Sequence, residues 1–210
     1  MGIVKVWKDE RGWRHIDWEL RGVTVVMLDW WFCNMDRGYE LWQPEDHKYF
    51  RWIRKPKQGW PIGALQETIQ KFGAGPYVKD YIRWEDVETA PDEIKSIIVY
   101  DHVVVAGLVG LAPPDQEVQE AHKPLSYVIH QWEATEFGVR GRSTGALPPE
   151  EVENWAQHAQ IEQSRLEEFL PQLYMLWSVI KDPEVNPQCC FKVVREGNII
   201  RYAFKTAKRT

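Results

Sequence analysis

The sequence has few cysteines, and their arrangement argues against two common classes of protein. Among 210 residues there are only three, Cys33, Cys189 and Cys190. An odd number does not suit a disulfide-stapled secreted domain, and the spacing matches no zinc-binding motif. We therefore expect three free thiols and a reducing compartment, the cytoplasm.

The sequence also lacks an excess of positive charge and a long apolar run. Its formal net charge of −5 argues against the basic surface that nucleic-acid-binding proteins use. The longest apolar run, residues 103–113, contains two glycines and is too short to cross a bilayer. The first residues lack the apolar segment of a signal peptide. We expect neither nucleic acid nor a membrane as a partner.

Aromatic residues, in contrast, are abundant. The chain has 12 tryptophans, 8 tyrosines and 7 phenylalanines. Many will fill the core that a chain of this length can bury, but a surplus also suits the wall of a pocket for a flat ligand. We expect a small aromatic molecule as the partner, and a homo-oligomer is compatible with the sequence.

Residues 149–180 carry a strong helical pattern. Pro149 and the acidic residues that follow it suit a first helical turn, because proline lacks the N–H that is unpaired there and acids complement the helix dipole. At about 100° per residue, eight apolar side chains share one stripe. They are Val152, Trp155, Ala156, Ala159, Leu166, Phe169, Leu170 and Leu173. The pattern predicts a long helix packed on the core, with a kink near Pro171.

The rest of the chain predicts strands and two short helices. We expect strands at residues 23–32, 77–84, 97–111 and 126–142, short helices at 44–55 and 64–72, and a hairpin within 189–205. Several long strands and one long C-terminal helix indicate an α+β fold in which a curved antiparallel sheet wraps around that helix. We expect a single domain, residues 1–210, with a catalytic core at about 23–180.

Two polar residues stand out on the long predicted helix. Glu162 falls in the middle of the apolar stripe, and His158 lies one turn earlier, within reach of the same point. A buried carboxylate costs several kcal/mol unless a partner replaces the lost water, and a metal ion is one such partner. The alternative is an ordinary core pair, with Glu162 bound to an arginine and His158 to a carbonyl.

Two further segments each contribute a candidate ligand. His47 lies in the predicted helix 44–55, and Asp80 is the polar member of an otherwise apolar strand face, unless a register shift exposes it. With His158 and Glu162 they form a set of two imidazoles and two carboxylates, whose charge of −2 a divalent ion cancels. Nitrogen and oxygen ligands of this kind suit zinc, with iron or manganese as competitors.

Three groups of motifs then appear in a distinctive order. They are Trp30-Trp31-Phe32 with Tyr39-Glu40-Leu41-Trp42-Gln43-Pro44-Glu45-Asp46-His47, then His130-Gln131-Trp132 with Arg140-Gly141-Arg142-Ser143, and then His158, Glu162, Leu166 and Phe169-Leu170-Pro171-Gln172-Leu173-Tyr174. Over roughly residues 23–177 this order resembles the 2,4-diacetylphloroglucinol hydrolase family, to which phloretin hydrolase is related. The resemblance implies a helix-grip, Bet v 1-like fold.

The resemblance also implies a metal site. By it, His47, His158 and Glu162 bind zinc, and Asp80 stands where the family has a metal-binding glutamate. Aspartate is one methylene shorter, which moves the metal or opens a coordination position.

For the substrate, the resemblance implies a phenol pocket and a carbon–carbon hydrolase. Tyr39 would hydrogen-bond a phenolic oxygen, and His130 would be a polar catalytic group. The bond broken would join an acyl group to a phenolic ring, as in an acylphloroglucinol. Phe50 stands where the family has an asparagine that contacts the substrate, so the metal centre transfers better than the identity of the substrate.

Two other functions remain open at this point. The same metal and pocket would also serve the cyclisation or isomerisation of an aromatic polyketide, in which no water is added. A helix-grip protein can also bind a lipid or phenol without catalysis, and a metal-free protein would favour that interpretation. Arg142 could bind an anionic phenol, although an arginine at a strand end is more often solvated.

Overall fold

A computed structural model describes residues 2–197 and 199–205 of the chain. The strands are β1 (Gly2–Lys8), β2 (Arg14–Arg21), β3 (His47–Arg54), β4 (Leu65–Gln70), β5 (Val78–Trp84), β6 (His102–Ala112), β7 (Ser126–Thr135), β8 (Gly138–Ala146), β9 (Val193–Glu196) and β10 (Ile199–Tyr202). The helices are α1 (Val25–Trp31), α2 (Tyr39–Trp42), α3 (Asp92–Lys95) and α4 (Pro149–Trp177), with short 3₁₀ turns η1 (Met35–Arg37) and η2 (Ala203–Lys205).

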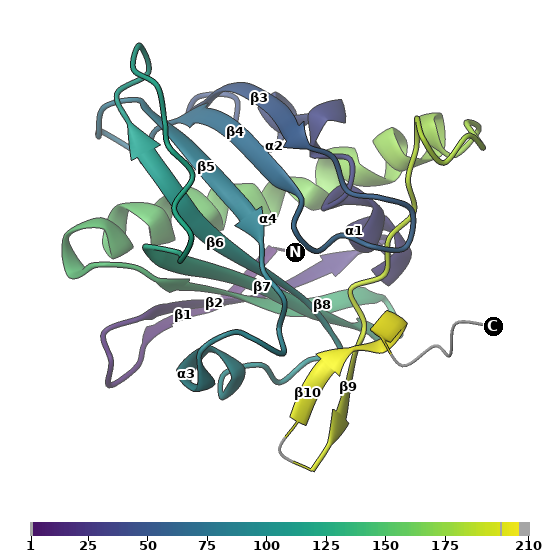
Figure 1. Ribbon diagram of the computed structural model, residues 1–210. Helices are drawn as coiled ribbons and strands as arrows, with labels where there is room; N and C mark the ends of the chain where they lie inside the picture. The colour runs from purple at the N-terminus through teal and green to yellow at the C-terminus, as the bar shows by residue number, and fades with distance from the viewer. Residues whose placement is uncertain (1, 198, 206–210) are drawn as a thin grey trace.

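Eight strands form one antiparallel sheet that curves around α4. Their order is β1-β2-β8-β7-β6-β5-β4-β3, so the two ends of the sheet come from the first third of the chain. Figure 1 shows α4 crossing one face of the strongly twisted sheet, with α1 and α2 beside it. This arrangement is the predicted α+β helix-grip fold, which is confirmed.

The long helix forms as its sequence predicts. α4 begins with Pro149 in its first turn, followed by two glutamates, and it buries most of the predicted stripe. Trp155 packs against Gly145 of β8, where an added Cβ would lie 2.4 Å from the indole ring. A glycine on the sheet therefore makes room for an aromatic side chain on the helix.

The apolar run at residues 23–32 forms a helix, so the predicted strand is wrong. Thr24 caps α1 by accepting a hydrogen bond from the backbone N–H of Met27. The run buries Trp30, Trp31 and Phe32 among other aromatic rings. Its residues do not alternate between apolar and polar, and a continuous apolar run fits a buried strand or a buried helix equally well.

The two short helices predicted nearby are strands. Residues 47–54 form β3, an edge strand whose exposed Tyr49 and Arg51 alternate with the more buried Phe50 and Trp52. Residues 65–70 form β4, which pairs with β3 and β5. Proline and acids at 44–46 form a turn, in which the His47 N–H bonds to the Gln43 carbonyl at 2.8 Å, rather than a helix start.

The other expectations for the sheet are largely met. β5 occupies residues 78–84 and β6 begins five residues later than expected, at His102. Residues 126–142 are not one strand: a turn after Thr135 separates β7 from β8. Gly138 begins β8 with a φ of 156°, and a Cβ there would lie 2.1 Å from the Leu20 carbonyl oxygen, so a glycine allows β8 to approach the end of β2 closely.

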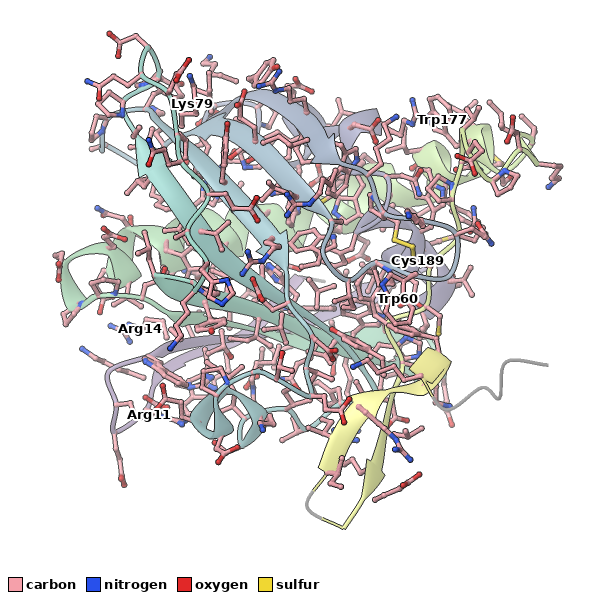
Figure 2. All side chains as sticks on the ribbon, in the orientation of Figure 1. Arg11, Arg14, Trp60, Lys79, Trp177 and Cys189 are labelled. Atoms are coloured by element: carbon pink, nitrogen blue, oxygen red, sulfur yellow. A yellow bond between two sulfur atoms is a disulfide. The ribbon has the colours of Figure 1, made fainter. Side chains whose placement is uncertain are left out.

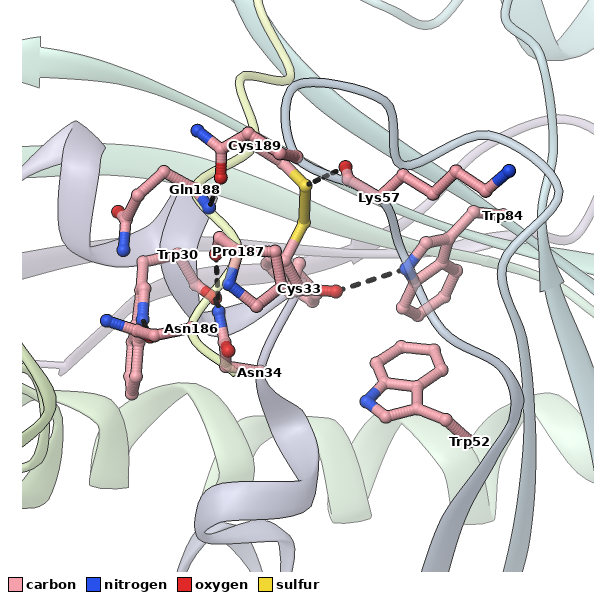
Figure 3. The surroundings of a disulfide bond; sticks show 12 residues. Trp30, Cys33, Asn34, Trp52, Lys57, Trp84, Asn186, Pro187, Gln188 and Cys189 are labelled. Atoms are coloured by element: carbon pink, nitrogen blue, oxygen red, sulfur yellow. Dashed lines mark hydrogen bonds between the residues drawn. A yellow bond between two sulfur atoms is a disulfide. The ribbon is translucent and has the colours of Figure 1, made fainter. Parts of the chain in front are cut away.

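The prediction of three free thiols is also wrong, because Cys33 and Cys189 form a disulfide. The bond joins the end of α1 to a segment 156 residues later (Figures 2 and 3). Hydrogen bonds reinforce the link: Asn34 Nδ2 donates to the Pro187 carbonyl at 2.9 Å, and Trp30 Nε1 donates to Asn186 Oδ1 at 2.6 Å. The odd number of cysteines did not predict this bond, because the number and spacing of cysteines in the sequence do not reveal which of them are close in the fold.

After the disulfide the chain forms a small second sheet. β9 and β10 pair in the region predicted as a hairpin, and Asn198 between them lies outside the described residues. Figure 1 shows this pair projecting from the main sheet. None of the helices in the described part of the chain is long and apolar enough to cross a membrane.

Candidate metal centre and cavity

A cavity of about 300 Å³ lies between α4 and the concave face of the sheet. Its walls are mainly aromatic and aliphatic and include Phe32, Trp42, Trp84, Val128 and Trp155. At one end it reaches exposed residues, among them Pro76, Leu111 and Asn154, so a ligand has an entrance between the start of α4 and the ends of the central strands. The abundant aromatic residues therefore form both the core and the wall of a pocket.

Three of the predicted metal ligands converge at this cavity. His47 Nε2 and His158 Nε2 are 3.2 Å apart, and Glu162 Oε1 lies 3.3 Å from the first and 3.2 Å from the second. All three side chains are buried; His158 and Glu162 line the cavity, and His47 packs against them. His47 comes from the start of β3. His158 and Glu162 come from consecutive turns of α4, as their spacing of four residues requires.

The other nitrogen of each histidine is already engaged. His47 Nδ1 lies 2.8 Å from the Tyr39 carbonyl oxygen, which only an N–H can bond. His158 Nδ1 lies 2.8 Å from Asp46 Oδ2. In its neutral form, a ring bonded in this way carries its proton on Nδ1, which leaves the Nε2 lone pair on the side of the carboxylate. A carboxylate or carbonyl bound to the distal nitrogen is typical of metal-binding histidines.

The geometry of these donors fits a small divalent ion. Two ligands of a tetrahedral zinc ion bonded at about 2.0 Å lie roughly 3.3 Å apart. The three observed separations are 3.2–3.3 Å. Two imidazoles and one carboxylate form a set that suits zinc, iron or manganese. The residues present therefore fit the predicted metal, and two of them, His158 and Glu162, line the cavity.

Electrostatics reinforce the anionic character of Glu162. Burial alone would raise its pKa, but the charge and hydrogen bond of His158, together with His47, outweigh burial and hold the pKa at about 2. Burial likewise opposes protonation of His158, yet Glu162 and Asp46 together raise its pKa. The alternative drawn from the sequence was a core pair in which Glu162 binds an arginine. In the structure the Glu162 carboxylate instead faces His47 and His158.

Asp80 is buried at the same cavity but is not part of the compact group of three. Its Oδ1 accepts a hydrogen bond from the Thr68 hydroxyl, and its Oδ2 accepts one from Gln70 Nε2 at 2.7 Å. Burial raises the Asp80 pKa to about 6, although these hydrogen bonds oppose the rise. Both oxygens are thus engaged by neighbours on β4.

Tyr39 connects to Asp80 through the same glutamine. Its hydroxyl donates to Gln70 Oε1 at 2.9 Å, and its ring stacks on His47 at a centroid distance of 3.8 Å. Burial, reinforced by the charges of Asp80 and Glu162, keeps the Tyr39 pKa well above its usual value. Tyr39 therefore remains protonated at neutral pH, at the wall of the cavity.

His130 lies on the opposite wall, on β7. Its Nδ1 is 2.8 Å from the hydroxyl oxygen of Ser143, and Trp18 Nε1 donates to the same oxygen at 3.1 Å. Its ring stacks on Phe32 with the centroids 5.3 Å apart. Burial lowers the His130 pKa to about 4, with the Glu162 charge opposing, so the imidazole is neutral at pH 7 and can accept a hydrogen bond.

Sequence reasoning missed the residues that support this site. Asp46 falls at the predicted helix start, and Thr68 and Gln70 belong to no motif. Asp46 directly precedes His47 and Ser143 ends the motif Arg140-Gly141-Arg142-Ser143, but neither position predicts a contact with a histidine. Such contacts become visible only through strand register, which pairs Thr68 with Asp80 and Ser143 with His130.

Two other polar groups lie outside the cavity lining. Arg142 faces away and pairs with Asp17 at 2.6 Å, with its guanidinium over the Trp7 ring. Asp29, His102 and Cys190 form a second group of potential metal donors, in which Asp29 Oδ1 already binds His102 Nδ1 at 2.9 Å. Of the two groups of potential metal donors among the described residues, His47, His158 and Glu162 are the group at the cavity described above.

Comparison with known proteins yields one partial sequence match and a shared fold. No protein-family model matches the sequence. A segment is 31% identical over 78 residues to phloretin hydrolase of Eubacterium ramulus; the match covers 35% of this chain and only 26% of that protein. This is a distant similarity over about a third of the chain.

Among solved structures, protein Ms6760 of Mycobacterium smegmatis matches with a TM-score of 0.55 and 15% identity, covering 81% of this chain and 98% of that one. Ara h 8.0201 matches with a TM-score of 0.45 and 14% identity, covering 77% of this chain and 99% of that one. The match to Ms6760 shows the common fold and nothing further.

Proposed function

We propose that this chain is a metal-dependent hydrolase that cleaves the carbon–carbon bond between an acyl group and a phenolic ring. The observation that supports the proposal most is the convergence of His47 Nε2, His158 Nε2 and Glu162 Oε1 within 3.2–3.3 Å beside an aromatic cavity. Three lone-pair donors placed so closely repel one another unless a cation or a proton lies between them. The partial similarity to phloretin hydrolase adds support for a phenolic substrate.

In this proposal His47, His158 and Glu162 hold zinc, with iron or manganese as alternatives. The ion would supply a Lewis acid at the end of the cavity and lower the pKa of a bound water. Three protein ligands leave a coordination position open, as catalytic sites require. Asp80 is proposed as a positioning residue, because its carboxylate holds Gln70 and, through Gln70, the Tyr39 hydroxyl.

Tyr39 and His130 would act on the substrate. The protonated Tyr39 hydroxyl can hydrogen-bond a phenolic oxygen, and the neutral His130 can accept a hydrogen bond from a neighbouring phenol. The Phe32 and Trp42 rings pack against His130 and restrict water on that side. Each group is therefore in the protonation state that its role needs at neutral pH.

The overall reaction consumes one water. A proton is added to the ring carbon that bears the acyl group, which interrupts aromaticity and weakens the bond to the acyl carbon. Water adds to the acyl carbonyl, the carbon–carbon bond breaks, and its electron pair restores the aromatic ring. The products are a carboxylic acid and the deacylated phenol, so atoms and charge balance.

Mass spectrometry of products from acylphloroglucinols tests this reaction. We expect a carboxylic acid and a phenol whose summed mass exceeds that of the substrate by one water. Tyr39→Phe and His130→Asn should lower kcat by about 10²–10⁴, the range of a positioned acid or base. A product of unchanged mass would instead identify a cyclase or isomerase, and binding without turnover would identify a binding protein.

A further inference from the structure

A second group of potential metal ligands, Asp29, His102 and Cys190, lies away from the cavity. One donor atom from each residue lies within 4.8 Å of the other two. Asp29 is buried, His102 is partly buried and Cys190 is exposed. None of the three lines the cavity, and the reaction proposed above uses none of them.

Three distant parts of the chain meet at this group. Asp29 lies in α1, and His102 is the first residue of β6. His102 also forms a β-bridge with Lys192, which brings Cys190 beside the start of β6. The disulfide described above (Figure 3) ties the residue before Cys190 to the end of α1. The fold therefore places the three donors together before any ion binds.

His102 and Cys190 both interact with the Asp29 carboxylate. His102 Nδ1 lies 2.9 Å from Asp29 Oδ1. Burial raises the Asp29 pKa, and hydrogen bonds with His102, the Phe191 backbone and the Cys190 thiol oppose that rise. Partial burial raises the pKa of the Cys190 thiol; the Lys192 backbone opposes this rise and the Asp29 charge adds to it. Protons that a metal ion can displace therefore hold the group together.

The chemistry and spacing of these donors suit Zn²⁺. Thiolate, imidazole and carboxylate are the side-chain ligands that zinc takes, at about 2.3 Å for sulfur and about 2.0 Å for nitrogen and oxygen. A tetrahedral ion then separates the sulfur from either other donor by roughly 3.5 Å. The observed separations extend from 2.9 Å to no more than 4.8 Å, so small side-chain movements suffice. The two negative charges of the ionised carboxylate and thiolate balance those of the ion.

We propose that Asp29, His102 and Cys190 form a second Zn²⁺ site, which is structural and exchanges its ion with solvent. The ion displaces the thiol proton, which is released to water, and the neutral His102 ring carries its proton on Nε2 so that Nδ1 binds the ion. One proton is therefore released for each ion bound. Three protein ligands hold the ion and one of them is exposed, so we expect the site to be empty after purification without added metal. A bound ion would join α1, β6 and the segment after the disulfide.

A Co²⁺ titration followed by ultraviolet absorption tests this site. A thiolate ligand gives Co²⁺ an intense charge-transfer band that nitrogen and oxygen ligands do not give, and the site at the cavity contains no sulfur. Without reductant, Cys190 is the one free thiol. We expect the band of purified wild type to saturate at about one added equivalent of Co²⁺. Zn²⁺ should then remove the band, because zinc binds such sites more tightly than cobalt.

Variants identify the ligands. Cys190→Ser should remove the band. Loss of an outer partner of a metal ligand weakens binding about 10- to 100-fold, so His102→Gln, which removes a ligand itself, should raise the Kd for Co²⁺ by more than about 100-fold. His122→Gln is the matched control, because it makes the same change at an exposed histidine in the loop before β7, and its Kd should equal that of wild type. Circular dichroism verifies the fold of each variant.

Three results would overturn the inference. They are the absence of a charge-transfer band in wild type, a band that persists in Cys190→Ser, and equal Kd values for His102→Gln and wild type, which would indicate an exposed thiol that binds metal alone. His158→Ala separates this site from the proposed function. It disrupts the donors at the cavity and should keep the full band, and a band lost in this variant would also contradict a separate second site.

Discussion

The carboxylate of Asp46 should strengthen metal binding without touching the metal. Its Oδ2 accepts the Nδ1 proton of His158 at 2.8 Å, and both side chains are buried. In Asp46→Asn the amide oxygen can still accept that proton, so the ring keeps its orientation and only the negative charge is lost. Loss of such a partner typically weakens metal affinity 10- to 100-fold. Because the orientation survives, we expect the lower end, about tenfold or ~1.4 kcal/mol.

The assay is competition for Zn²⁺ between the protein and a chromophoric chelator of known affinity. Asp115→Asn, in the exposed loop after β6, is the matched control, since it makes the same charge change on the surface. The control should bind Zn²⁺ with the wild-type Kd. An unchanged Kd in Asp46→Asn, or equal losses in both variants, would refute a supporting role for Asp46.

Three further predictions concern the fold. Reducing the Cys33–Cys189 disulfide should lower stability by about 2–4 kcal/mol, seen as a lower midpoint of urea unfolding; an unchanged midpoint would contradict the link. A hydrogen bond from Arg54, opposed by burial and aided by Arg83, holds the Glu120 pKa at about 2. The ionised Glu120 therefore stabilises the fold fully above pH 4.5, and this stabilisation is lost as pH falls through 2. At pH 7 the free energy of unfolding of wild type should exceed that of Glu120→Gln by roughly 1 kcal/mol. Urea titrations should show this difference vanish near pH 2. Gly145→Ala should cost about 1–3 kcal/mol in the same assay by displacing the indole that packs there, and equal stability would show that this ring moves freely.

The long helix and the general layout could be predicted because both depend on local pattern. The stripe on α4 repeats over five turns, and Pro149 marks its start, so residues 152–170 specify a buried helical face by themselves. The same periodicity placed His158 and Glu162 on one side of the helix. Their proximity in the structure follows from that spacing alone.

The first part of the chain could not be assigned in the same way. Residues 25–31 form a helix and 47–54 an edge strand because of their neighbours in space: α1 packs beside α4, and β3 pairs with β4. A short apolar run does not distinguish these outcomes. His47 nevertheless lies beside His158 and Glu162, as predicted. It is the first residue of its segment, so its position is the same whether the segment forms a helix or a strand.

The contacts that support the site could not be predicted from the sequence because they cross strands. Gln70 joins Tyr39 to Asp80, and Ser143 holds His130, only because strand register brings them together. The Cys33–Cys189 pair likewise becomes apparent only in the folded chain, because 156 residues separate the two cysteines. A single sequence therefore points to three side chains that converge, His47, His158 and Glu162, but not to the residues that orient them.

The metal content of the purified protein tests the central claim most directly. Elemental analysis should find about one equivalent of a divalent transition metal in wild type and in Cys190→Ser, which alters only the second group of donors. His158→Ala and Glu162→Ala should each retain less than about a tenth of an equivalent while keeping the wild-type circular dichroism spectrum. Full metal retention in both of these variants, or a wild type without metal, would contradict the account.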